Sequence, residues 1–389
     1  MTAPFSQQLE KSALAAVHDQ RLRLGLAATA ILTVWFAMHF PRLFLPDVSG
    51  QDYAAFFAAA RAAATGLNGN LYDPVVFQDA VGAETTLLWL YPPPMLFFLA
   101  PFGLLTPGVM KLAFAFAGAG LVYGLFRRTG GGALFGVLGV LSPASFAALY
   151  VGQISAFFAC LLAGGLASAT KKPVLAGVCF GILTLKPTYG LMVIPFLIAT
   201  RAWKAIAAAI ATSVLMIVLS AIVFGFEMWR DFFASLFEGV HAAYYQSGGH
   251  PGRITLSDAI KAAGLPSPPA LVLYGPLLAI ATAGLFAIAK HAPRPLLIAY
   301  ALVASAVVSP YFFVYDYIIV NVAVIIAAVY VKDMNMRASW LLLAVWFAPI
   351  LPFIGGSTAT PAIAWPIAAA SLATLFTLAR GPAPKFSLA

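Results

Sequence analysis

Long apolar segments, separated by short polar turns, run through almost the whole chain. Hydrophobic residues make up 62% of its 389 residues and charged residues only 9%, whereas a soluble domain carries about 25% charged residues. The sequence therefore predicts a polytopic membrane protein. Within a bilayer the backbone must satisfy its own hydrogen bonds, so spans are helices or closed barrels. The apolar runs are longer than barrel strands, and the predicted fold class is therefore all-α.

A helical span needs about 20 apolar residues. We expect a first span at 24–45, a polar loop at 46–90, and a further polar loop at 225–269. The remaining expected spans are 108–127, 131–149, 153–169, 173–185, 189–200, 203–224, 270–289, 295–309, 313–331, 338–354 and 361–379. This pattern predicts one bundle of about twelve helices that occupies residues 1–389 as a single domain.

Basic residues cluster on one side of this predicted topology. They form pairs at 21/23, 127/128, 171/172, 201/204, 290/294, 332/337 and 380/385, which with Lys11 account for 15 of the 22 Lys and Arg residues. The positive-inside rule places such turns in the cytoplasm. Segment 1–23 is therefore expected to be cytoplasmic, and loops 46–90 and 225–269 to face outside the cytoplasmic membrane. Because topology explains the net charge of +9, we expect no nucleic-acid partner.

Two regions leave the path of the chain open. Residues 87–127 fit either two spans or one span preceded by a short helix at Tyr91–Leu105 on the outer surface. Two spans would move Arg127 and Arg128 outside, so the charge rule favours one. In region 173–200, Pro187 lacks an N–H donor and restricts Lys186. We expect the chain to turn there, inside the protein or in a wet cavity.

The loop at 46–90 gathers acidic residues at one membrane face. These are Asp47, Asp52, Asp73, Asp79 and Glu84, in a chain with 13 acids. Asp52 begins a segment with apolar side chains at helical spacing, namely Tyr53, Phe56, Phe57, Ala60 and Ala64, which predicts an amphipathic helix along the membrane surface. Asp52 fits a helix cap first, and it also fits a general base that faces a cleft. The two interpretations are compatible.

Three further polar residues stand out against apolar surroundings. Lys186 is costly in a membrane segment, so it indicates either a phosphate partner or a side chain that reaches the interface. Asp316 fits a group that positions a polar substrate or pairs with a lysine, but also an aromatic belt with one cap residue. Gln153 follows Gly152 and suits a hydrogen bond to a substrate hydroxyl or an ordinary turn.

The second loop adds one candidate and no metal site. Arg253 suits a phosphate clamp, although it equally suits an ordinary polar loop. His241 and His250 lie nine positions apart, which does not match a helical metal pair. We therefore predict no metal ligands and assign neither histidine a role.

The order of several motifs resembles bacterial glycosyltransferase family 87, in particular its polyprenyl-phosphate-mannose-dependent group. The motifs, which extend over roughly residues 20–330, are the Asp52-Tyr53 helix, Gly66 followed by Leu71-Tyr72, Tyr91-Pro-Pro-Pro, Gly152-Gln153, Gly181 followed by Lys186-Pro187, and Ser309-Pro-Tyr followed by Tyr315-Asp316. The resemblance implies the GT-C architecture with an active site at the outer face. It also implies Asp52 as catalytic base and Lys186, Gln153, Tyr91, Asp316 and Arg253 as substrate-binding residues.

The implied activity is inverting transfer of a sugar from a polyprenyl-phosphate donor to a lipid or glycan acceptor, without a cofactor. Mannose is the usual sugar of the resembled group, and arabinofuranose is an alternative. The expected partners are membrane lipids, the donor and the acceptor. A transporter or flippase also fits interrupted helices with a lone lysine, but no internal two-fold repeat is evident and the acids lie in long outer loops. An inactive membrane scaffold is a third possibility.

Overall fold

The computed structural model describes residues 29–34, 38, 52–66, 71–81, 88–130, 132–237, 252–331, 334–355 and 360–381. In these ranges the chain forms α-helices and short 3₁₀ helices, with one isolated β-bridge between Arg253 and Phe313. The predicted all-α class is confirmed. Segment 1–23, most of the predicted first span and the stretch with His241 and His250 lie outside the described residues.

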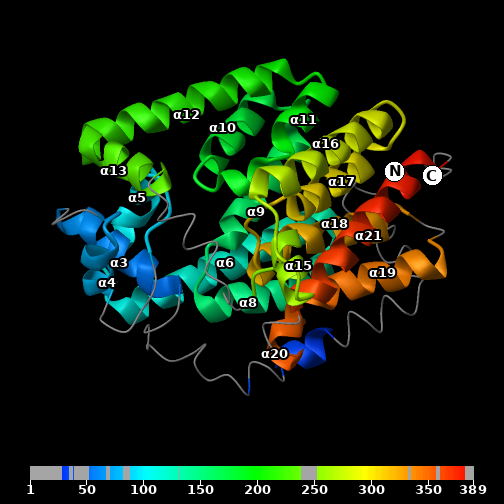
Figure 1. The fold of residues 1–389 in the computed structure, drawn as a ribbon, viewed down its shortest axis with the longest axis horizontal. Coiled ribbons are helices and arrows are strands. Elements are labelled where there is room, and N and C mark those ends of the chain that lie inside the picture. Colours follow the sequence, from blue (N-terminus) through cyan, green and yellow to red (C-terminus); the bar gives the residue numbers. More distant parts are fainter. Residues whose placement is uncertain are drawn as a thin grey trace, which may run out of the picture.

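Figure 1 shows the order of the helices along the chain. The first part contains α3 (Asp52–Thr65), α4 (Pro74–Val81), α5 (Met95–Leu99), η2 (Ala100–Phe102), α6 (Pro107–Gly130), α7 (Ala133–Val140) and α8 (Pro143–Val151). The middle contains α9 (Ser155–Ser168), α10 (Pro173–Leu183), η3 (Pro187–Gly190), α11 (Val193–Ala199), α12 (Trp203–Phe224), α13 (Phe226–Phe237) and α15 (Leu256–Ala262). The last part contains α16 (Ala270–Ala289), α17 (Arg294–Val307), η4 (Val314–Tyr317), α18 (Ile318–Tyr330), α19 (Met336–Phe347), η5 (Ala348–Ile350), α20 (Leu351–Gly355) and α21 (Thr360–Arg380).

Fewer helices reach the length of a membrane span than the sequence predicts. Within the described residues, five are long and apolar enough: α6, α12, α16, the continuous stretch Met336–Phe353, and α21. A sixth arises if α7 and α8, bent by 50° relative to each other, form one broken span. The predicted count of about twelve is not confirmed, because segments 153–169, 173–185, 189–200, 295–309 and 313–331 form shorter apolar helices.

The break at Lys186 shows why an apolar run does not become one helix. Helix α10 ends at Leu183. Lys186 has a non-helical backbone conformation, with φ −135° and ψ 74°, and Pro187 then begins η3. Proline disfavours helix in the residue before it and lacks the N–H donor needed to continue one. The predicted turn is therefore present. Region 87–127 likewise holds the short α5 and η2 followed by the single long helix α6.

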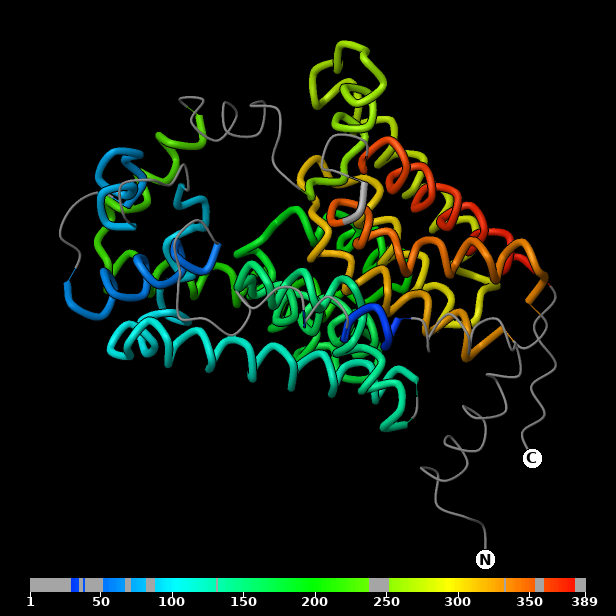
Figure 2. Tube along the Cα trace, turned by 90° about the horizontal axis from the view of Figure 1, so that it is seen from below, coloured from blue at the N-terminus to red at the C-terminus, as the bar shows by residue number. Residues whose placement is uncertain are grey.

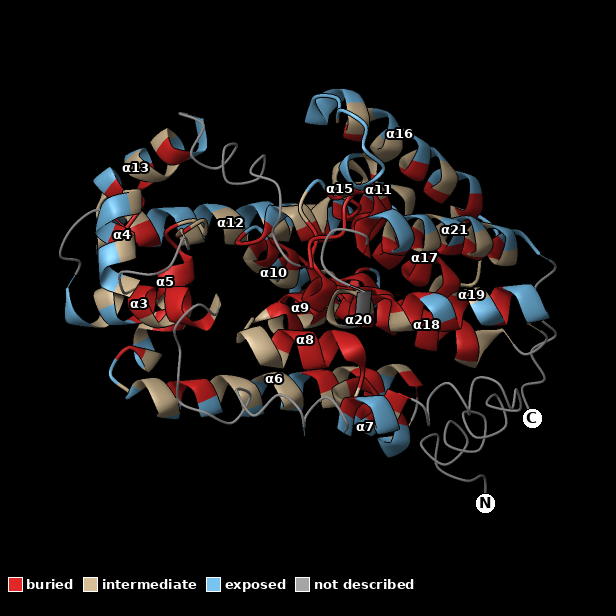
Figure 3. Cartoon of the chain, turned by 60° about the horizontal axis from the view of Figure 1, so that its bottom comes forward, coloured by how far each residue is buried: buried red, intermediate tan, exposed pale blue. Residues whose placement is uncertain are grey.

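The core lies around α17 and α18. Almost every residue of α18 is buried, and it packs against α6, α9, α17 and α19. Figure 3 shows α17 and α18 mostly in the colour of buried residues. A helix that is apolar on all sides is stable when other helices surround it. Helix α12 contrasts with this, since only 11% of an apolar 18-residue stretch of this helix is buried inside the protein.

Helices α3, α4, α5 and α13 form a group at one end of the molecule, to which α12 extends from the core (Figures 1 and 2). The packing within this group is close. A Cβ added at Gly103 would lie 2.0 Å from the carbonyl oxygen of Ala60, so the backbone of η2 touches α3. Helix α3 is buried on more than the face predicted from its apolar spacing, because Ala54 and Ala58, which are not on that face, are buried as well as Phe56. The expected one-sided amphipathic helix is therefore wrong in this respect.

Candidate active site

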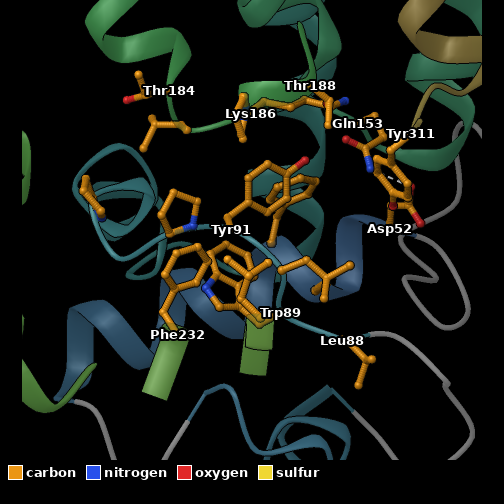
Figure 4. A pocket seen from close by; sticks show the side chains of 18 of the residues that line it. Asp52, Leu88, Trp89, Tyr91, Gln153, Thr184, Lys186, Thr188, Phe232 and Tyr311 are labelled. Carbon is orange, nitrogen blue, oxygen red and sulfur yellow. Dashed lines mark hydrogen bonds between the residues drawn. The ribbon is translucent and has the colours of Figure 1, made fainter. Parts of the chain in front are cut away.

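A cavity of about 770 Å³ lies between the α3–α5 group and the core. Its wall combines α3, residues 88–94, the turn between α8 and α9, residues 184–188, α12, α13 and residues 311–315. The polar lining side chains include Asp52, Gln153, Thr184, Lys186 and Thr188, and the apolar ones include Met216, Ile217, Phe232, Phe233 and Leu236. Figure 4 shows Asp52 beside Gln153, with Lys186 and Thr188 along one edge and Trp89 and Phe232 along another. The cavity thus has both a polar wall and an apolar wall.

Asp52 reaches this cavity because the start of α3 packs against the α8–α9 turn. Helix α8 ends at Val151 and is capped by Gly152, which adopts a left-handed conformation with φ 72°. A Cβ at Gly152 would lie only 2.4 Å from Cβ of Tyr53. Glycine is therefore required here both for its backbone conformation and for the close approach of α3. The contact places Asp52 next to Gln153.

The side chain of Gln153 holds the Asp52 carboxylate. Its Nε2 donates to Oδ2 of Asp52 at 2.6 Å and lies 3.5 Å from the hydroxyl of Tyr315. Burial raises the pKa of Asp52 above its ordinary value of 3.8, while the hydrogen bond from Gln153 and the charge of Lys186 act in the opposite direction. A carboxylate with a raised pKa accepts a proton more readily than an exposed one.

Lys186 forms a buried ion pair with Asp316. Its Nζ lies 2.7 Å from Oδ1 of Asp316, and the two side chains are 7% and 0% exposed. The same oxygen accepts hydrogen bonds from Ser155 and Tyr189, each at 2.7 Å. The other carboxylate oxygen accepts the backbone N–H of Phe313 at 3.2 Å. Asp316 therefore fastens together three stretches of chain around the cavity.

Asp316 itself does not line the cavity, whereas Lys186 does. The sequence allowed Asp316 either to position a substrate or to pair with a lysine, and the structure has the lysine pair. An ammonium carries three N–H donors, so one bond to Asp316 leaves Lys186 with the capacity to bind an anion in the cavity. The Lys186 ammonium also makes a cation–π contact with Tyr189, whose ring centroid lies 4.7 Å from Nζ.

The other two predicted substrate-binding residues differ in position. Tyr91 lines the cavity, its carbonyl accepts a bond from the Tyr72 hydroxyl at 2.8 Å, and its ring stacks on Phe158. Arg253 does not line the cavity. It binds Asp258 through Nε at 2.8 Å and Nη2 at 2.6 Å. The structure thus brings Asp52, Gln153, Lys186 and Tyr91 together, but neither Arg253 nor Asp316 to the cavity surface.

Several lining residues were not predicted from the sequence. Thr188, Trp89 and Tyr311 belong to the wall, and their only signal was proximity in sequence to Lys186, Tyr91 and Asp316. The aromatic side chains of Trp229 and Phe232 on α13 also line the cavity. In the described part of the chain, no group of three or more His, Cys, Asp or Glu side chains is arranged to hold a metal ion.

The cavity therefore has a carboxylate placed to take a proton, a cation placed to attract an anion and an apolar wall. No curated protein and no solved structure was found to match the chain. Residues 89–310 match the family described as glycosyltransferase family 87, and this range covers more than half of the 389 residues. It includes Tyr91, Gln153, Lys186 and Arg253, while Asp52 and Asp316 lie outside it. The chain belongs to glycosyltransferase family 87 and is a membrane glycosyltransferase.

Proposed function

We propose that the protein transfers a sugar from a polyprenyl-phosphate donor to a hydroxyl of a lipid or glycan acceptor. The proposal rests chiefly on Asp52 and Lys186, which share one cavity with an apolar wall formed by α12 and α13. A donor of this class has a sugar, a phosphate and an isoprenoid chain. The polar wall suits the first two and the apolar wall suits the third. Mannose is the sugar that we propose to test first.

In the proposed reaction Asp52 acts as general base. The acceptor oxygen attacks the anomeric carbon while its proton moves to the Asp52 carboxylate. The bond between the anomeric carbon and the phosphate oxygen breaks, and the polyprenyl phosphate leaves with the electron pair. Because attack and departure occur on opposite faces of the carbon, the configuration inverts. Lys186 stabilises the charge that develops on the leaving phosphate.

The site is proposed to face the outside of the cytoplasmic membrane. The support is the distribution of basic residues, which assigns the loop with Asp52 to the side opposite the Lys- and Arg-rich turns. A transporter is not retained, because the chain belongs to a glycosyltransferase family. Arg253 remains a weaker candidate for phosphate binding, and it would have to leave Asp258 to reach the donor.

A transfer assay in reconstituted membranes tests the proposal. Labelled polyprenyl-phosphate-mannose and a lipid extract from the source organism are supplied to the wild type and to Asp52→Asn. The proposal expects labelled product from the wild type alone, with equal amounts of folded protein in both samples. Product from both proteins would remove Asp52 as the base, and no product from either would refute the mannose donor.

A further inference from the structure

Two buried polar atoms of the cavity wall have no hydrogen-bond partner among the described residues. They are Oε1 of Gln153 and Oγ1 of Thr188. Buried polar groups in folded proteins are nearly always hydrogen-bonded, to protein or to ordered water. Thr184 provides a contrast in the same wall, because its hydroxyl donates to the carbonyl of Gly181 at 2.6 Å. The two atoms therefore require a partner, either water or a ligand, that the described residues do not supply.

The chemistry of that ligand follows from the orientation of Gln153. An ionised carboxylate only accepts hydrogen bonds, so the amide NH₂ of Gln153 faces Asp52, as the 2.6 Å bond shows. Oε1 then points away from Asp52, and it can only accept. Neither the oxygens of an ionised phosphodiester nor an isoprenoid chain carries a donor. Oε1 therefore requires an O–H or N–H group, which a sugar hydroxyl supplies.

Both atoms belong to segments that are anchored on the same oxygen. Oδ1 of Asp316 accepts from Ser155, two residues after Gln153, and from Tyr189, the residue after Thr188. The same oxygen binds Lys186. The segments 153–155 and 186–189 are therefore held in fixed positions on Asp316 before any ligand arrives, which is the requirement for selective recognition by hydrogen bonds.

We propose that Gln153 and Thr188 form a sugar-hydroxyl recognition pair, in which Oε1 and Oγ1 each bind one hydroxyl of a sugar next to Asp52. This inference deepens the proposed function and rests on it. In this proposal Gln153 and Thr188 bind sugar hydroxyls, and Lys186 binds the anion. The sugar is either the one transferred or one that belongs to a glycan acceptor.

The decisive comparison uses Thr188→Val, which removes the hydroxyl at nearly constant size, and Thr188→Ser, which keeps it. Thr212→Val on α12 is the matched control, because it removes a hydroxyl that is already bonded to the backbone carbonyl of Ala208 at 2.8 Å and that does not line the cavity. We expect Thr188→Val to lower kcat/KM roughly tenfold, equivalent to about 1.4 kcal/mol. Thr188→Ser should retain most of the activity and Thr212→Val should change it little.

The assay supplies short-chain polyprenyl-phosphate sugars, namely mannose, glucose and arabinofuranose, and then versions of the best donor that each lack one hydroxyl. If the pair binds the transferred sugar, removing one donor hydroxyl lowers kcat/KM about tenfold with the wild type. The same deoxy donor causes no further loss of kcat/KM with Thr188→Val. If an acceptor sugar is read, Thr188→Val raises the KM for the acceptor extract by the same factor with every donor. Either result supports the recognition pair.

Gln153→Met tests the second member of the pair. It should weaken transfer and also shift the acid limb of the pH–rate profile upwards, because the carboxylate of Asp52 loses a donor. Melting temperature verifies folding, and if this variant fails to fold, the Thr188 comparison alone decides.

If the wild type transfers sugar but Thr188→Val behaves like Thr212→Val with all substrates, the two atoms bind only water. The inference is then overturned while the proposed function stands. If the wild type uses no sugar in the panel, the proposed function fails and takes the inference with it.

Discussion

The ion pair between Lys186 and Asp316 should respond very differently to the loss of one partner and to the loss of both. The perturbation is Asp316→Asn, Lys186→Met and their combination. The two side chains are 0% and 7% exposed, so a single substitution leaves a charge in surroundings that solvate it poorly. The double variant leaves no charge, and it should therefore be less damaged than the sum of the single variants.

The magnitudes follow from what each remaining partner retains. Breaking a buried pair typically costs about 3–5 kcal/mol, and we expect this for Asp316→Asn, since Lys186 then loses its ion-pair partner and keeps only the longer-range attraction of Asp52. The carboxylate left by Lys186→Met keeps bonds from Ser155, Tyr189 and the Phe313 N–H. We therefore expect a smaller cost of about 1–3 kcal/mol. A coupling of about 1.5 kcal/mol or more should separate the double variant from additivity.

Equilibrium unfolding in mixed detergent micelles measures these free energies. The control is the exposed pair Arg230–Glu227 on α13, whose side chains are 67% and 69% exposed. Glu227→Gln should change the unfolding free energy by less than about 0.5 kcal/mol. A cost below about 1 kcal/mol for Asp316→Asn would show that the pair is solvated like a surface pair. A costlier Lys186→Met would refute the compensation argued for Asp316.

Three further predictions concern Asp52 and its support. Because burial raises the pKa of Asp52, its folded-state pKa lies above the unfolded one. The protonated Asp52 carboxyl therefore contributes to the free energy of unfolding at low pH, and this contribution is lost as the pH rises through the folded-state pKa. Asp52→Asn should therefore abolish transfer while leaving the melting temperature at neutral pH equal or higher; a clear drop would contradict this. The same raised pKa should place the acid limb of kcat/KM above the range of an exposed carboxyl, and a limb near 3.8 would argue against Asp52 as base. Gly152→Ala should reduce transfer strongly, because its Cβ would meet Tyr53 at 2.4 Å. Gly66→Ala is the control, with φ +93° and no atom within 4 Å, and equal effects of the two would show backbone strain alone to be responsible.

The polar residues of the site could be selected from the sequence, and a lysine partner was one of the roles open to Asp316, but the sequence did not identify Lys186 as that partner. Asp52, Gln153 and Lys186 were conspicuous because a charge or amide in an apolar protein needs a reason to be there. The bond between Lys186 and Asp316 joins residues 130 positions apart. No local pattern encodes such a separation. Thr188 was overlooked because a threonine in a turn is unremarkable until its hydroxyl proves to be buried without a partner.

The helical class was also predictable, whereas helix lengths were not. Mean hydropathy reports how apolar a segment is, but prolines such as Pro187 set where its helix ends. Helix α18 and helix α12 are both strongly apolar in sequence. The structure surrounds α18 with other helices and leaves α12 mostly exposed. Only tertiary packing distinguishes a helix that other helices cover from one that stands at the outside.

The exposure of α12 has a consequence for substrate size. On that side the cavity is bounded by α12 and α13, which contribute Ser213, Met216, Ile217, Trp229, Phe232, Phe233 and Leu236 to the wall and no charged side chain. The side of α12 that faces away from these residues carries Leu215, Val218 and Ile222, all more than 45% exposed. This boundary is therefore a single helix thick. For the polyprenyl-phosphate donor proposed above, selectivity for chain length would reside in these two helices and could change in evolution without altering the polar residues beside Asp52.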